Sequence, residues 1–145
     1  MVTIGPISKD DLEELKILYD NGLQGTKTDL MKMNEVFDWM KGNPDYYVLC
    51  AKYNNKVVGS LMGVLNKELF GECRPFMVIE NVVVSDECRR MGIGKLLMDR
   101  IEIIARENEC TVMMLISSMH RREAHLFYES VGFSGDLGRG FRKYL

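Results

Sequence analysis

The sequence lacks any long apolar run and any marked excess of one charge. Its longest apolar stretches, such as residues 112–116, are far too short to span a bilayer, and residues 1–11 lack the apolar run of a signal peptide. Its 19 Lys and Arg residues against 21 Asp and Glu residues leave a formal net charge of -2, which gives nucleic acid no electrostatic attraction. We therefore expect a cytoplasmic protein that has neither a membrane nor a nucleic acid as its partner.

Cysteine and histidine are too few and too scattered for the common zinc motifs. The four cysteines are Cys50, Cys73, Cys88 and Cys110. None of them forms a C-x-x-C pair, and neither His120 nor His125 lies at a zinc-like spacing from a cysteine. We expect four reduced thiols, as is usual in the cytosol, and no bound metal.

What the sequence does contain is typical of one globular domain with a substantial core. Hydrophobic residues make up 46% and charged residues 28% of the 145, which argues against disorder. A chain of this length buries enough apolar surface to fold without disulfides or metals. No repeat, low-complexity tract or linker divides it, so residues 1–145 are expected to form a single domain.

Alternating and helical hydrophobic patterns predict the order of the elements. In the first half we expect a strand at residues 2–7, a helix capped by Asp10 or Asp11 that runs to about Asn21, a helix at 33–40, and strands at 46–53, 56–65 and 76–84. In the second half we expect helices at residues 92–108 and 122–130, a buried strand at 111–116, and short final strands at Phe133 and at 141–145. The Asn54-Asn55 dipeptide is typical of a tight hairpin turn. This order predicts the α/β class, as an α+β mixed sheet with helices on its faces.

Residues 79–95, IENVVVSDECRRMGIGK, are the most informative stretch. A strand ends at Val84 and a glycine-rich turn then opens a helix, so several backbone N–H groups point to one place, where the helix dipole adds positive potential. Arg89, Arg90 and Lys95 add charge there. The segment therefore predicts a site for a phosphate or pyrophosphate.

Two common phosphate-binding motifs do not fit this segment. The P-loop requires G-x-x-x-x-G-K-[ST], but Leu96 stands where Ser or Thr is needed, and no glycine lies at the right distance upstream. The dinucleotide fingerprint requires G-x-G-x-x-G, but Leu97 replaces the third glycine after Gly92 and Gly94. What remains is R-x-x-G-x-G, which begins at Arg89.

Residues 89–94, RRMGIG, resemble the [QR]-x-x-G-x-[GA] pyrophosphate loop of the GNAT acetyltransferase superfamily. Residues 124–133, AHLFYESVGF, resemble that family's later motif, A-x-x-F-Y-E-x-x-G-F. The two blocks stand in the expected order, separated by one helix and one strand. Arg90 departs from the family pattern, since many relatives carry glycine there, and Arg121 stands where many carry asparagine.

The resemblance implies a GNAT-like fold and acetyl-CoA as the cosubstrate. The implied fold is a central, mostly antiparallel sheet of about six to seven strands flanked by about four helices. The pantetheine arm would pair with the free edge of the strand before the loop, and a free N–H on that strand could polarise the thioester carbonyl. The residues implied to bind acetyl-CoA are Val82, Val83, Val84, Arg89, Arg90, Met91, Gly92, Ile93, Gly94, Lys95, Ser117 and Phe127.

Glu80 and Tyr128 are the candidate catalytic residues. On an alternating strand Glu80 would share a face with Val82 and Val84, and Asn81 would point to the other face. Because burying a carboxylate is costly unless it is paired or used, we interpret Glu80 as the general base, with a salt bridge or an exposed strand end as the alternative. The later motif implies that Tyr128 is the general acid that protonates the departing CoA thiolate, with a core aromatic as the alternative.

The acceptor is less constrained by the sequence. Residues 117–145, with R-x-x-A-H-x-F-Y at 121–128, look like aminoalkylphosphonate N-acetyltransferases, which implies a small amine that bears an anionic group. Amino sugars, polyamines and protein N-termini stay open.

The predicted activity is acetyl transfer from acetyl-CoA to a primary amine of a small molecule, by direct attack in a ternary complex. A catalytically silent acyl-CoA-binding sensor or interaction module is the alternative. The expected partners are acetyl-CoA and a small amine, with a homodimer also allowed. Such enzymes usually bind their acceptors at the N-terminal helices.

Overall fold

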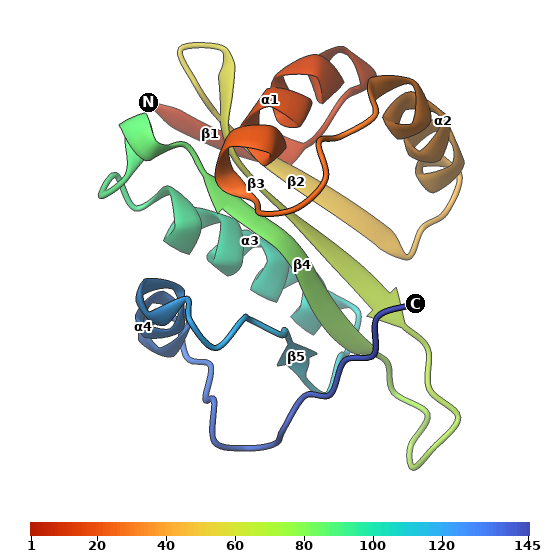
Figure 1. The fold of residues 1–145 in the computed structure, drawn as a ribbon. Helices are drawn as coiled ribbons and strands as arrows, with labels where there is room; N and C mark the ends of the chain where they lie inside the picture. The colour runs from red at the N-terminus through yellow and green to blue at the C-terminus, as the bar shows by residue number, and fades with distance from the viewer.

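A five-stranded sheet separates two layers of helices in the computed structural model, which describes all residues from 1 to 145 (Figure 1). The strands are β1 (Val2–Pro6), β2 (Tyr46–Tyr53), β3 (Lys56–Asn66), β4 (Phe76–Val84) and β5 (Met113–Met114). The helices are α1 (Leu12–Gly22), α2 (Leu30–Lys41), α3 (Ile93–Glu107) and α4 (Arg122–Ser130). Two short 3-10 turns, η1 (Lys9–Asp11) and η2 (Asp86–Cys88), precede α1 and the turn into α3.

The strands lie across the sheet in chain order, from β1 to β5. The first three pairings are antiparallel and the β4–β5 pairing is parallel, because the crossover between these two strands contains α3. This mixed, mostly antiparallel sheet with four α-helices confirms the predicted fold class. The predicted number of strands was too high by the two C-terminal ones.

Each face of the sheet carries its own core. On one face α3 buries Ile93, Leu97 and Ile101 against strand residues that include Leu61 and Met77. On the other face α1 buries its own apolar stripe against Cys50, Val57 and Val83. The helical spacing of the apolar residues in both helices is what lets each present a continuous face to the sheet.

The hairpin and the start of α2 follow from local chemistry. Asn54 and Asn55 have φ values of 49° and 64°, which confirms the tight turn between β2 and β3. Helix α2 begins earlier than predicted because the carboxylate of Asp29 accepts a hydrogen bond from the N–H of Lys32 at 3.1 Å. This cap satisfies one of the free donors at the start of the helix.

The C-terminal part of the sheet is smaller than predicted. The buried strand expected at residues 111–116 is reduced to Met113 and Met114, because only Met77 and Val78 of β4 pair with it. Its outer face is open, with Ile116 exposed. Neither Phe133 nor residues 141–145 form a strand, so both predicted final strands were wrong.

The longest helix, α3, has 15 residues. No helix combines the length and the apolar character needed to cross a membrane.

Candidate functional site

A bulge in β4 shapes the centre of the molecule. Met62 pairs with Glu80 and Ser60 pairs with Val83, so the single residue Leu61 lies opposite both Asn81 and Val82. Asn81 has a φ of 54°, a left-handed conformation that asparagine tolerates better than other side chains with a Cβ. The extra residue shifts the in-and-out alternation of the strand by one position.

The bulge overturns the predicted orientation of Glu80. Residues directly opposite each other on paired strands share a face, and Met62, the partner of Glu80, lines a hollow under α2. Val82 and Val84 instead pack against the core on the α3 side. Glu80 is therefore exposed on the α1 and α2 face of the sheet, opposite to Val82 and Val84, and it forms no ion pair.

The second half of β4 has a free edge. Pairing with β5 stops at Val78, and in Figure 1 the chain beyond β5 turns away from β4 toward α4. The N–H of Ser85 donates to the carbonyl of Val58 in β3 at 2.8 Å. Because backbone groups alternate along a strand, Val82 and Val84 direct theirs to the open side. A ligand with amide groups can pair with this edge.

The turn into α3 lies at the end of this free edge. Gly92 caps the helix in the left-handed region, with a φ of 74°. None of the N–H groups from Arg90 to Lys95 donates to a backbone or side-chain acceptor, whereas the N–H of Leu96 bonds the Gly92 carbonyl at 3.0 Å. A row of free donors at a helix start is the arrangement that binds phosphates.

The three basic side chains of this turn differ in their freedom. Arg89 forms an ion pair with Asp86 at 2.7 Å, and Lys95 forms one with Asp99, also at 2.7 Å. Arg90 forms none, so it carries the unpaired positive charge of the turn. Its φ of 67° explains why glycine suits this position, since a side chain there costs about 1–2 kcal/mol of backbone strain.

Gly94 allows α3 and α4 to meet. A Cβ built on Gly94 would lie 2.9 Å from the Cζ atom of Phe127, which is closer than carbon atoms approach. Phe127 therefore packs directly on the first turn of α3. The predicted cofactor-binding residues Gly94 and Phe127 are thus brought together, and a larger residue at 94 would displace α4 as well as crowd a ligand.

The C-terminus of α4 fixes the position of Tyr128. The N–H of Phe133 donates to the carbonyl of Tyr128 at 3.0 Å, and the N–H of Gly132 donates to the carbonyl of Glu129 at 3.1 Å. These two bonds, with a φ of 98° at Gly132, form a Schellman cap. The ring of Phe133 then packs edge-on against Tyr128, with ring centroids 6.1 Å apart.

Tyr128 has the properties of a proton donor. It is half-buried beside Phe127, and its hydroxyl forms no hydrogen bond within the protein. Burial raises the pKa of the Tyr128 hydroxyl, and the positive charge of Arg121 partly opposes the shift. The phenol is therefore protonated at neutral pH and free to donate.

The hydroxyl oxygen of Ser117 is the one buried side-chain polar atom that has no hydrogen-bond partner. Ser117 belongs to the segment that connects β5 to α4, and its Oγ makes no hydrogen bond. The next residue, Ser118, is held in place, because its carbonyl lies 2.9 Å from Nε2 of His125 on α4. A buried hydroxyl without a partner is costly, so the position fits a ligand group that completes its hydrogen bonding.

A hollow of about 380 Å³ opens on the opposite face, between α1, α2 and the bulge. Its polar lining consists of Asp20, Gln24, Thr26, Thr28, Lys32 and Asn81. Tyr19 also lines it, and burial raises the pKa of the Tyr19 hydroxyl. Because Asn81 belongs to the bulge of β4, the hollow reaches the part of the strand that follows Glu80.

Asp20 holds the loop that forms one wall of this hollow. Its carboxylate accepts hydrogen bonds from the ammonium of Lys16 and from the N–H of Thr28, the latter at 2.8 Å. The Lys16 ammonium, with the Thr28 amide, lowers the pKa of Asp20 below its ordinary value. This wall is thus fixed to the end of α1.

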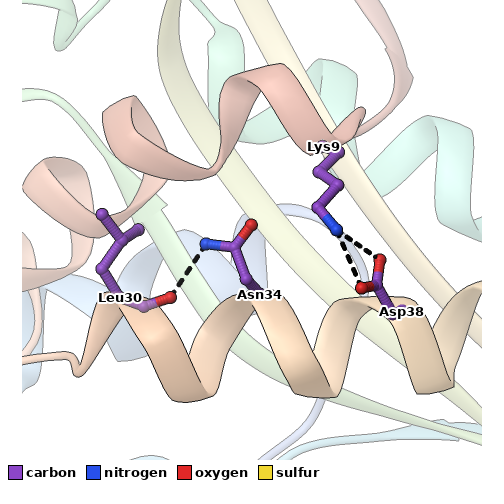
Figure 2. A network of polar contacts seen from close by, with 4 residues as sticks. All are labelled: Lys9, Leu30, Asn34 and Asp38. Carbon is purple, nitrogen blue, oxygen red and sulfur yellow. Dashed lines mark hydrogen bonds and ion pairs between the residues drawn. The ribbon is translucent and has the colours of Figure 1, made fainter.

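Helix α2 forms the other wall and is held more loosely. Figure 2 shows the ammonium of Lys9 hydrogen-bonded to both carboxylate oxygens of Asp38, at 2.9 and 2.8 Å, which ties α2 to the η1 turn before α1. The amide of Asn34 donates to the carbonyl of Leu30 within α2 itself, at 2.9 Å. No residue of α2 is fully buried, and an exposed ion pair contributes only about 0–1 kcal/mol.

Tyr19 and Asn81 line this hollow but were not among the site residues predicted from the sequence. Tyr19 falls inside the helix predicted to run to about Asn21 and was given no role in the site. Asn81 was predicted only to point to the other face of the strand, but asparagine is a poor strand former and favours left-handed conformations, which was an available signal for a bulge. No group of three or more His, Cys, Asp and Glu side chains is gathered in a way that could hold a metal.

Comparisons with known proteins concern the family and the fold of the chain. The sequence model of the acetyltransferase (GNAT) family matches residues 12–133 of this chain. A "probable glucosamine 6-phosphate N-acetyltransferase" of Drosophila melanogaster is 29% identical over 99 residues, which are 67% of this chain and 44% of that protein. The uncharacterized N-acetyltransferase YhdJ of Bacillus subtilis (strain 168) is 32% identical over 89 residues, which are 61% of this chain and 62% of that protein. The matches therefore cover less than two thirds of either relative.

Solved structures share the whole fold. A protein of Agrobacterium tumefaciens strain C58, described as a "putative acetyltransferase", superposes with a TM-score of 0.89 at 26% identity, over 99% of both chains. Glucosamine-6-phosphate N-acetyltransferase from Arabidopsis thaliana superposes with a TM-score of 0.88 at 19% identity, over 99% of this chain and 98% of that one. At that identity the second likeness concerns the fold alone. The resemblance to aminoalkylphosphonate N-acetyltransferases stays a prediction.

Proposed function

Because the chain belongs to the GNAT acetyltransferase family, we propose that it is an N-acetyltransferase that moves an acetyl group from acetyl-CoA to the primary amine of a small molecule. The observation that carries this proposal is the row of free N–H donors from Arg90 to Lys95, at the end of the open edge of β4. The amine would attack directly in a ternary complex. A silent acyl-CoA-binding module is less consistent with the free side chains of Glu80 and Tyr128.

The residues on the α3 and α4 side fit acetyl-CoA. The donors of the 90–95 turn and the guanidinium of Arg90 would hold the pyrophosphate, as charge-assisted hydrogen bonds do. The backbone groups of Val82 and Val84 on the open edge would pair with the pantetheine amides, and the Ser117 hydroxyl is available to a further polar group. When bound, acetyl-CoA supplies the activated thioester.

The chemistry divides between the two faces of β4. Glu80, on the α1 and α2 face, would take a proton from the incoming ammonium so that the nitrogen lone pair can form the new N–C bond. A free N–H of the β4 edge would polarise the thioester carbonyl. As the C–S bond breaks, Tyr128 on the other side would give its proton to the leaving sulfur. The acylated nitrogen would then lose its second proton, which restores the tyrosine, and Glu80 would release its own proton to solvent.

The polar hollow beside Asn81 is the proposed acceptor site. An acceptor reaching Glu80 from this hollow would not compete for space with a cofactor on the far side of the strand. Lys32 lines the hollow and forms only a long, exposed ion pair of 3.8 Å with Glu35, so its ammonium would give an anionic group of the acceptor a partner. The name of the Drosophila relative, a glucosamine 6-phosphate N-acetyltransferase, describes an acceptor that combines an amine with an anion.

Amine-dependent thiol release from acetyl-CoA tests the activity directly. We expect a panel of small primary amines, with and without anionic groups, to include at least one that raises thiol release well above the rate of spontaneous hydrolysis. The N-acetylated product should form in equal amount, as mass spectrometry can verify. Tight binding of acetyl-CoA without release by any amine would favour the silent module instead.

Arg90→Gly tests the pyrophosphate turn. Glycine removes about 1–2 kcal/mol of backbone strain. It raises the conformational entropy cost of folding by about 0.5–1 kcal/mol, so the variant should be at least as stable as the wild type. Loss of the guanidinium should weaken acetyl-CoA binding about 10-fold or more, the scale of a charge-assisted hydrogen bond, as calorimetry would measure. Arg100→Ala, which removes the same charge from an exposed position further along α3, is the control. Equal affinities in both variants would exclude Arg90 from the site.

Tyr128→Phe tests the acid. The ring that packs against Phe133 stays, so folding and acetyl-CoA affinity should hold. If Tyr128 protonates the leaving sulfur, kcat should fall about 10²-fold or more in steady-state assays. A kcat close to that of the wild type, with chemistry limiting the rate, would leave Tyr128 a packing residue.

Glu80→Gln tests the base. The amide keeps the shape but cannot accept the proton, so kcat/KM should fall about 10²- to 10⁴-fold at neutral pH. The loss should shrink as the pH approaches the pKa of the acceptor amine, because the free amine then forms without help. The measurement is kcat/KM against pH for both proteins with one amine. Profiles that stay parallel across the pKa of the amine would assign Glu80 to binding instead.

A further inference from the structure

A second, apolar hollow of about 150 Å³ lies beneath α2 and joins the polar one. Ten of its 11 lining residues are hydrophobic. Tyr19, Met33, Val36 and Asn81 line both hollows, so the two share a boundary that reaches the bulge of β4. The apolar hollow, called the apolar chamber below, is thus adjacent to the proposed acceptor site.

The composition of the apolar chamber restricts what can fill it. Its floor comes from Val48 and Met62 on the sheet, and its wall toward α2 comes from Phe37 and Met40. A sugar hydroxyl placed here would lose its hydrogen bonds to water and gain few in return, which is costly. An apolar cavity of about this volume holds one aromatic ring or a branched alkyl group.

We propose that the acceptor is an amine with one apolar substituent, aromatic or branched aliphatic, that occupies this chamber. The proposal rests on the proposed acetyl transfer and narrows its substrate class. The amine lies at the bulge beside Glu80, the apolar group lies under α2, and a carboxylate or other anionic group lies in the polar hollow toward Lys32. An α-amino acid with an apolar side chain has all three groups around one carbon atom.

The polar hollow by itself does not distinguish between amines that carry hydroxyl groups and amines that carry anionic groups. The chamber adds discrimination, because one methylene more or less in an apolar pocket changes kcat/KM by about 10- to 200-fold. Gaining or losing a whole aromatic ring should therefore change kcat/KM by more than about 10-fold.

The test compares L-phenylalanine with glycine, which differ only by the benzyl group. We expect wild-type kcat/KM, expressed per free amine, to be about 10-fold or more higher for phenylalanine. Val48→Phe, which fills the chamber from the sheet, should reduce this ratio toward one. Met40→Trp fills the same space from α2 and serves if the first variant does not fold. A ratio between two substrates is independent of the fraction of active protein.

Met31→Phe is the matched control, because Met31 lies on α2, is 76% exposed and lines neither hollow. It should keep the wild-type ratio. Three results would overturn the inference: equal kcat/KM for the two amino acids, a ratio that both filling variants leave unchanged, or a preference for glucosamine 6-phosphate that filling does not alter.

A binding measurement separates this inference from the proposed activity. If no amine releases thiol, the acetyl transfer fails, and calorimetry of phenylalanine and glycine in the presence of CoA then decides about the chamber. Preferential binding of phenylalanine that Val48→Phe removes would support the chamber as a ligand site. Equal binding of the two amino acids would overturn it.

Discussion

One extra residue in β4 determines how the rest of the site is arranged. With Asn81 and Val82 both opposite Leu61, the strand presents Glu80 to one helical layer and Val82 and Val84 to the other. A regular strand would place all three on one face. In the proposed reaction, the bulge would therefore let the amine and the thioester approach the same point of the backbone from different faces of the strand.

The residues of the two family motifs hold the backbone in place as much as they offer side chains. Gly92 and Gly132 take left-handed conformations that begin α3 and end α4. Phe133 closes the cap and packs on Tyr128, so the motif's last aromatic fixes the direction of the candidate acid. Few of these contacts are strong, but each removes a degree of freedom from a group that must be positioned within a fraction of an ångström.

The sequence predicted those parts of the site that depend on local chemistry. The glycine-rich turn, the end of α4 at Gly132 and the Asn54-Asn55 hairpin follow from backbone preferences of single residues, and the structure has all three. The orientation of Glu80 could not be predicted by alternation, because the register shift arises from pairing with β3. The hollows were missed because α1, α2, β2 and β3 each contribute residues that look like ordinary core or loop in isolation. The two predicted final strands are absent because Phe133 belongs to the cap of α4 and residues 141–145 pair with no other strand.

The contact between Gly94 and Phe127 makes the allowed residue sizes in two distant motifs depend on each other. The space available at the start of α3 is set by the ring on α4, and the position of that ring is set by the missing side chain at 94. Among related sequences, residue size at these two positions should vary in a compensating manner, with a larger residue at one matched by a smaller one at the other. Neither position is then free to evolve alone, even though 33 residues separate them in the chain.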